Sequence, residues 1–168
     1  MPAAPLLTSL NRPLRIAQIS AGPALGMVGL TLCPGKRQAV SVSGIWQRDL
    51  ATDLQAVQHW GAAAVVTLMP HSELQAVQAE GIGAACEALG IEWHHLPVQD
   101  VDVPDAAFEA AWLYAGLRLR EHLRAAPVDA REQAGLGAIE PDQHLSVDAE
   151  RVRESGCMAR LAAEIDGG

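Results

Sequence analysis

The stretch DLATDLQAVQHWGAAAVVTLM, residues 49–69, changes its hydrophobic period halfway along. Its first half carries apolar residues at intervals of three or four, which predicts one buried face of a helix. These residues are Leu50, Leu54, Val57 and Trp60. Gly61 follows at the position where glycine commonly ends a helix. Residues 63–69 are a short apolar run, typical of a buried strand, so a helix leads directly into a strand here.

The segments on either side continue this alternation of strands and helices. Further strand candidates are residues 14–20, 27–33 and 91–98, and helical periodicity occurs at 71–77, at 82–89 and from about 104 to 123. Strands that alternate with helices favour parallel pairing, because the chain must cross back between strands. We therefore predict an α/β fold with a mostly parallel central sheet flanked by helices.

The organisation along the chain divides into three parts. Residues 1–13 hold three prolines and are expected to form a flexible arm, and residues 14–126 carry the α/β domain. Residues 127–168 form a divergent C-terminal segment, which we expect to be mostly helical. Helical periodicity returns there from about residue 146 to 165, through Val152, Leu161 and Ile165.

Composition excludes several classes of protein. The 168 residues are 49% hydrophobic and carry a net charge of -8, which fits a globular domain and disfavours nucleic-acid or anionic-membrane binding. The three cysteines, Cys33, Cys86 and Cys157, are widely spaced and odd in number, so a disulfide framework or a zinc ribbon is not expected. With no signal-peptide pattern and no long apolar run, we expect a cytoplasmic protein without a cofactor.

The stretch HHLPVQDVDVPD, residues 94–105, gathers two histidines and three aspartates after a predicted strand. In parallel sheets, ligands bind at the carboxyl ends of strands, so this loop is a candidate site. Pro104 and Asp105 suit the first turn of the next helix, where the dipole favours an acidic residue. The residues alone leave Asp100 open as a catalytic acid, a metal ligand or a solvated loop acid.

Several strings, in order, resemble the dual-specificity branch of the cysteine-dependent protein phosphatases, especially the cyclin-dependent-kinase-associated type. They are CPGK at 33–36, IWQRDL at 45–50, GAAAVVTL at 61–68 and GIEWHHLPVQDVDV at 90–103, followed by the helix to about Leu123. The resemblance covers roughly residues 27–124. It implies a phosphatase-like fold, incomplete toward the C-terminal part.

The resemblance also implies a role for the loop after the HHLP strand. In that family an aspartate there is the general acid, and the match falls on Asp100, with Asp102 as the second choice. A cysteine thiolate attacks phosphorus in such enzymes, and the leaving oxygen needs a proton as its bond breaks. A solvated loop acid remains the alternative interpretation of Asp100.

The family's signature loop, H-C-x-x-G-x-x-R, is missing from this sequence. None of the three cysteines follows a histidine, and none has an arginine six positions later. Three placements of the gap stay open. In the first, residues 128–138 are a degenerate form of the signature loop. In the second, residues 154–164 match the end of that loop and the helix after it. In the third, which we slightly prefer, residues 135–143 match a family segment downstream of the loop, and the loop itself is deleted.

We therefore expect a phosphatase-like protein without phosphocysteine catalysis, either a pseudophosphatase or a truncated family member. Its partner would be a phosphoprotein or another phosphate-bearing ligand. The first alternative is an active phosphatase in which Cys157 reacts beside Arg160 or Arg153. The second is a metal-dependent hydrolase that uses His94, His95, Asp100 and Asp102, although adjacent histidines on a strand point to opposite faces.

Overall fold

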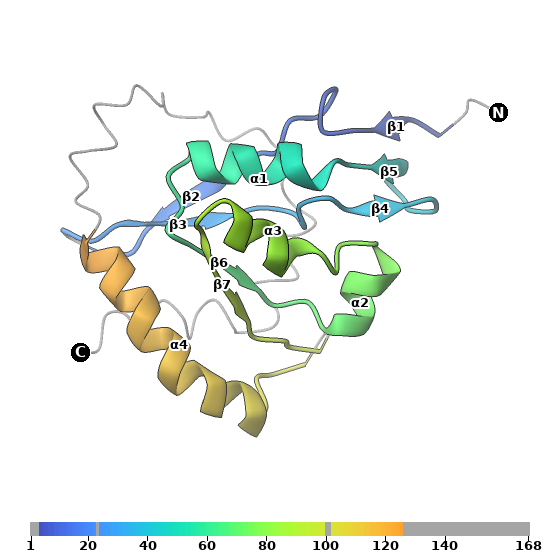
Figure 1. Ribbon diagram of the computed structural model, residues 1–168. Helices are drawn as coiled ribbons and strands as arrows, with labels where there is room; N and C mark the ends of the chain where they lie inside the picture. The colour runs from blue at the N-terminus through green and yellow to red at the C-terminus, as the bar shows by residue number, and fades with distance from the viewer. Residues whose placement is uncertain (1–3, 23, 100–101, 126–168) are drawn as a thin grey trace. The chain divides into compact units, whose positions relative to one another are not determined.

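The computed structural model describes residues 4–22, 24–99 and 102–125 (Figure 1). The chain divides into two compact units, the first from residues 1–17 and 30–97, the second from residues 18–29 and 98–168. The first unit holds β1 (Leu6–Leu7), β4 (Arg37–Gln38), β5 (Ile45–Gln47), α1 (Leu50–His59), β6 (Ala64–Thr67), α2 (His71–Ala76), α3 (Ile82–Ala88) and β7 (Glu92–His95). The other elements are β2 (Ala17–Ser20), β3 (Met27–Leu30) and α4 (Ala106–Ala125).

The strands form both parallel and antiparallel pairs. β6 and β7 are parallel neighbours, with Ala64 opposite Glu92 and Thr67 opposite His95, and α2 and α3 lie between them in the chain. β5 pairs in parallel with β1 and antiparallel with β4. The α/β class predicted from the alternating pattern is confirmed.

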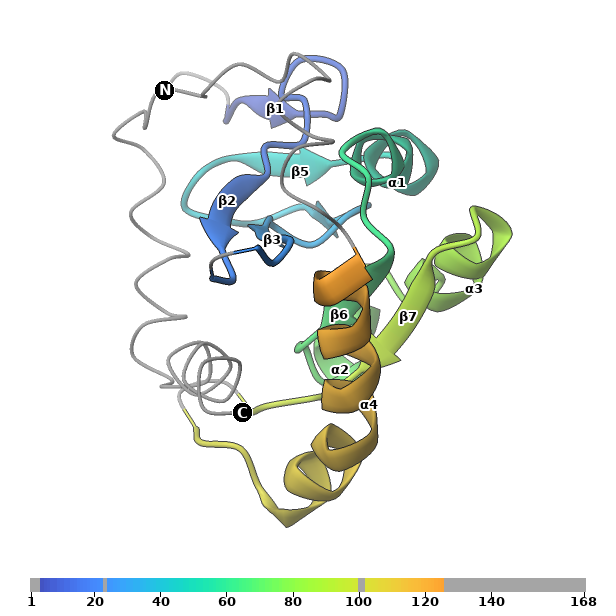
Figure 2. The ribbon, with the colours of Figure 1, turned by 90° about the vertical axis from the view of Figure 1, so that its left-hand side faces the viewer.

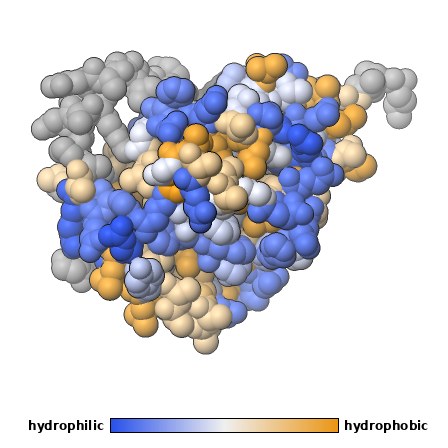
Figure 3. All heavy atoms as spheres, viewed as in Figure 1, coloured by the Kyte–Doolittle hydropathy of each residue, from blue (hydrophilic) through white to orange (hydrophobic). Residues whose placement is uncertain are grey.

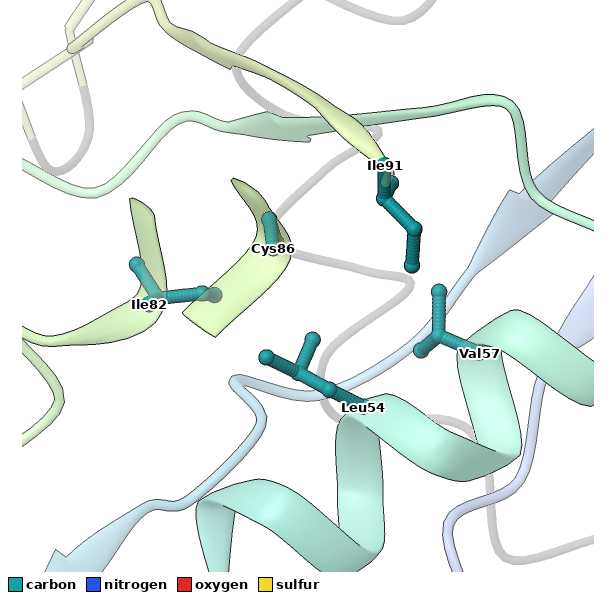
Figure 4. Close-up of a cluster of buried hydrophobic side chains, with 5 residues drawn as sticks. All are labelled: Leu54, Val57, Ile82, Cys86 and Ile91. Atoms are coloured by element: carbon teal, nitrogen blue, oxygen red, sulfur yellow. The ribbon is translucent and has the colours of Figure 1, made fainter. Parts of the chain in front are cut away.

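The core of the first unit lies between α1, α3 and the start of β7. Leu54 and Val57 of α1 meet Ile82 and Cys86 of α3, and Ile91 completes the cluster (Figure 4). Leu54 and Cys86 are fully buried. The helix face predicted from residues 50–60 is thus the face that α1 buries.

The boundaries of α1 follow from its end residues. The Asp49 side chain accepts a hydrogen bond of 2.8 Å from the Thr52 backbone N–H, which satisfies one of the free donors of the first turn. That hydrogen bond lowers the pKa of Asp49. Gly61 follows the helix with a φ of 86°, a left-handed conformation that glycine adopts without strain.

The short strands β1, β4 and β5 had no sequence signal. β1 lies within residues 1–13, expected to be a flexible arm, yet Leu6 and Leu7 pair with β5 and Leu7 is buried. Asn11 also donates from its side chain to the Leu6 carbonyl over 2.9 Å. Strands of two or three residues show no period, so pairing partners far along the chain define them.

The described part of the second unit holds most of a strand pair and a long helix. β2 and β3 are paired and lie side by side (Figure 2). The Gly26 N–H donates to the Leu123 carbonyl near the end of α4 over 2.7 Å. α4 buries the side of the helix that carries Phe108 and Trp112, whose rings stack. The helix predicted from residue 104 to about 123 is therefore present and extends to Ala125.

Candidate active site

The acidic loop before α4 is described from Asp102 onward, and Asp100 lies outside the described residues. Asp102 turns its carboxylate onto the backbone of the next residue, where Oδ1 accepts from the Val103 N–H over 2.8 Å. Asp105 Oδ1 accepts from the Phe108 N–H over 2.8 Å and so caps the first turn of α4. Asp105 is thus the helix-start residue, as expected, while the general-acid role of Asp100 stays a prediction.

The two adjacent histidines of β7 lie on opposite faces of the strand. His95 stacks on Trp93, and its Nε2 lies 2.8 Å from the Met69 carbonyl oxygen. His94 pairs instead with Glu92, with 3.0 Å between Nε2 and Oε1. This alternation is the period of a strand, so the metal hypothesis, which needs both rings at one ion, has the wrong geometry here.

The His94–Glu92 contact is short but lacks hydrogen-bond geometry. His94 is nine-tenths buried, and its Nε2 makes no hydrogen bond within the described part of the chain although the carboxylate is near. The two atoms are therefore close but poorly aligned for a hydrogen bond, and the contact is an ion pair only when the imidazole is protonated. Among the described residues, no three His, Cys, Asp or Glu side chains cluster closely enough to hold a metal ion.

Neither described cysteine resembles a reactive thiolate. Burial raises the pKa of the Cys33 thiol to about 11, although the nearby Lys36 opposes the shift, and Cys33 Sγ contacts the Pro34 carbonyl oxygen at 3.6 Å. Burial likewise raises the pKa of Cys86 to about 11, within the core cluster. At pH 7 a pKa of 11 leaves about one thiol in ten thousand ionised. Cys157 lies outside the described residues.

A buried arginine near Cys33 is already engaged by protein groups. Arg48 donates from Nε and Nη2 to the two carboxylate oxygens of Asp53, both over 2.8 Å, and from Nη1 to the Arg12 carbonyl over 2.7 Å. Asp53 Oδ2 also accepts from the Gly35 N–H over 2.9 Å. A guanidinium held in this way cannot also present its fork to a phosphate.

The Arg48–Asp53 pair escaped the sequence interpretation, which used Arg48 only as part of the IWQRDL string. The pair joins the segment before β2, the turn after Cys33 and the first turn of α1 in one hydrogen-bonded network. An arginine followed five residues later by an aspartate on the inner face of a helix was a weak signal for it. The three proposed placements of the signature loop, between residues 128 and 164, lie outside the described residues.

The comparisons with known proteins rest on structure. No protein-family model and no curated protein matches the chain. A crystal structure of a kinase associated phosphatase, with its catalytic-site cysteine substituted by serine, has a similar fold, with a TM-score of 0.57 and 20% sequence identity. The match covers 68% of this chain and 61% of that chain, so this chain spans less than two thirds of its length.

The structural match supports the fold expected from the resemblance. The chain has a phosphatase-like α/β fold, similar to that of the kinase associated phosphatase. No helix within residues 4–22, 24–99 and 102–125 is long and apolar enough to cross a membrane.

Proposed function

We propose that this chain is a phosphatase-like protein that does not hydrolyse phosphate esters through a phosphocysteine. The observation that carries the proposal is the state of the described thiols: Cys33 and Cys86 are both shielded, with pKa values raised to about 11. The sequence adds that no cysteine in the chain has an arginine six positions later. The phosphatase-like fold supports the family context of this proposal.

The chemistry requires two groups that work together. A thiolate must attack phosphorus, and a guanidinium must hold the phosphate oxygens while negative charge develops on them. A thiol with a pKa of about 11 is a poor nucleophile at neutral pH, and Arg48 is bound by Asp53. Asp100, as a general acid without a nucleophile to serve, would then be an idle carboxylate.

The remaining role that suits such a fold is binding. We propose a phosphoprotein or another phosphate-bearing partner, recognised without turnover. Because the net charge is -8, recognition would depend on local backbone N–H groups or a few basic side chains rather than on the overall field.

Hydrolysis of an aryl phosphate tests the proposal directly. The full chain should show no rate above the buffer background, and Cys157→Ser and Cys86→Ser variants should show the same. A rate that is lost in Cys157→Ser and kept in Cys86→Ser would establish the alternative, an active phosphatase that uses Cys157. Such a result would overturn the proposal.

Binding needs a separate measurement. Calorimetric titration of the full chain with phosphotyrosine or phosphothreonine peptides, each beside its unphosphorylated form, should give saturable binding only with a phosphorylated peptide. Equal binding of both forms of every peptide would remove the phosphate-binding part of the proposal, while the hydrolysis assay would still decide the catalytic part.

A further inference from the structure

α4 presents an apolar face to solvent. Leu113 is 73% exposed, Tyr114 71% and Leu117 58%, and Ala110 is exposed one turn before them. Apolar side chains reach the surface over this helix in Figure 3. Surface helices usually carry polar residues on the outer face, so a contiguous apolar row along a helix marks an interaction surface.

The opposite side of α4 is already packed. Phe108, Trp112 and Ala115 are buried, and Gly116 lies against the Trp112 ring, where an added Cβ would sit 3.0 Å from Cε2. α4 is therefore apolar on both sides over this length. The outer row ends at Glu121 and Arg124, which are exposed and polar. The exposed apolar face thus has a definite extent, from Ala110 to Leu117.

The chain itself contains a segment that matches this face. Met158, Leu161, Ala162 and Ile165 are spaced by three and four residues, the pattern of one apolar helix face. Ala110, Leu113 and Leu117 have the same i, i+3, i+7 spacing as Met158, Leu161 and Ile165. Each row spans about 10 Å along a helix, so the two rows are of equal length.

We propose that residues 157–165 dock as a helix on the exposed apolar face of α4. Roughly thirty residues separate the end of α4 from this segment, and a random coil of that length has a root-mean-square span of about 30 Å. α4 itself is about 30 Å long, so the segment can reach any point on the face. The tether corresponds to an effective concentration of about a millimolar, well above that of a second copy at micromolar protein.

Disulfide trapping tests the docking with the native Cys157, which is four residues before Leu161 and shares its helix face. Ala110→Cys places a thiol at the start of the apolar face and Glu121→Cys one turn beyond its end, whereas Ala111→Cys places one at an exposed position beside it. Cys33 and Cys86 interfere little, since burial raises the pKa of both to about 11.

The readout is the rate of intramolecular disulfide formation with Cys157 under oxidised glutathione, followed by peptide mass spectrometry on the folded full chain. At least one of the Ala110→Cys and Glu121→Cys variants should close tenfold faster or more than Ala111→Cys, and adding Leu161→Asp should abolish the difference. Equal rates at all three positions would overturn the proposal. So would disulfide-linked dimers whose rate rises with protein concentration, since they would identify a second copy as the occupant.

Discussion

Replacing Asp53 by alanine should be the most damaging single change in the first unit. Asp53 is 1% exposed and accepts three hydrogen bonds, two from Arg48 and one from the Gly35 N–H. Asp53→Ala would leave a guanidinium that is 2% exposed without its counter-charge. It would also leave the Gly35 N–H without an acceptor.

The expected magnitude follows from these two losses. Removing one partner of a buried ion pair costs about 3–5 kcal/mol, because the remaining charge stays desolvated. A buried backbone donor left unpaired costs about 1–3 kcal/mol, although the two losses overlap in one network. We expect the free energy of unfolding to fall by about 4 kcal/mol, a large part of the roughly 5–15 kcal/mol that stabilises a typical domain.

Urea unfolding followed by tryptophan fluorescence measures this loss of free energy, and two further variants serve as controls. Asp49→Ala removes only the α1 cap next to the pair, so it should cost about 1 kcal/mol. The double variant Arg48→Met/Asp53→Leu removes both charges and should regain most of the stability lost in Asp53→Ala. A loss below about 1 kcal/mol in Asp53→Ala, or a double variant no more stable than the single one, would refute the reasoning.

Three further predictions concern packing, capping and a thiol. Gly83→Ala should lower the free energy of unfolding by about 1–3 kcal/mol, because its Cβ would meet a tryptophan ring at 2.5 Å. Gly81→Ala, whose Cβ would lie 3.7 Å from its nearest neighbour, should be near neutral in the same urea assay. Asp105→Ala should lower the free energy of unfolding by about 1 kcal/mol, because the α4 cap is lost. Asp102→Ala removes no helix cap and should lower it less. Equal losses in thermal unfolding would contradict the capping role of Asp105. Burial raises the pKa of Cys86 to about 11, so iodoacetamide at pH 8 should alkylate it about 100-fold more slowly in the native chain than in urea. The difference between the two rates should shrink as the pH rises toward 11. Similar rates at pH 8, measured by mass spectrometry, would show an accessible thiolate.

Much of the fold was predictable because the signals are local. α1, α3 and β6 appear where the hydrophobic period predicted them, within one or two residues at each end. Periodicity reports which side chains share a face, and the core cluster in Figure 4 uses that face of α1. The period of a strand predicted the opposite faces of His94 and His95, and the preference of a helix start for proline and an acidic residue predicted the role of Asp105.

Other features had no local signal. β1 and β5 are defined by pairing between residues 6–7 and 45–46, which no sequence period records. Gly83 lies within α3 and allows that helix to approach the Trp93 ring closely, which no local pattern records. Of the candidate site, the sequence predicted Asp100, whose role stays a prediction.

The sequence by itself predicted the helices and the longer strands in order, and it showed that no cysteine has the spacing of a phosphate-binding loop. Only the tertiary structure decided whether the Cys33 thiol and the Arg48 guanidinium are available for phosphate chemistry. Burial raises the pKa of Cys33, and Arg48 is held by Asp53 and by the Arg12 carbonyl. The physical reason is that desolvation and ion pairing depend on neighbours far apart in sequence, so they appear only when the chain folds.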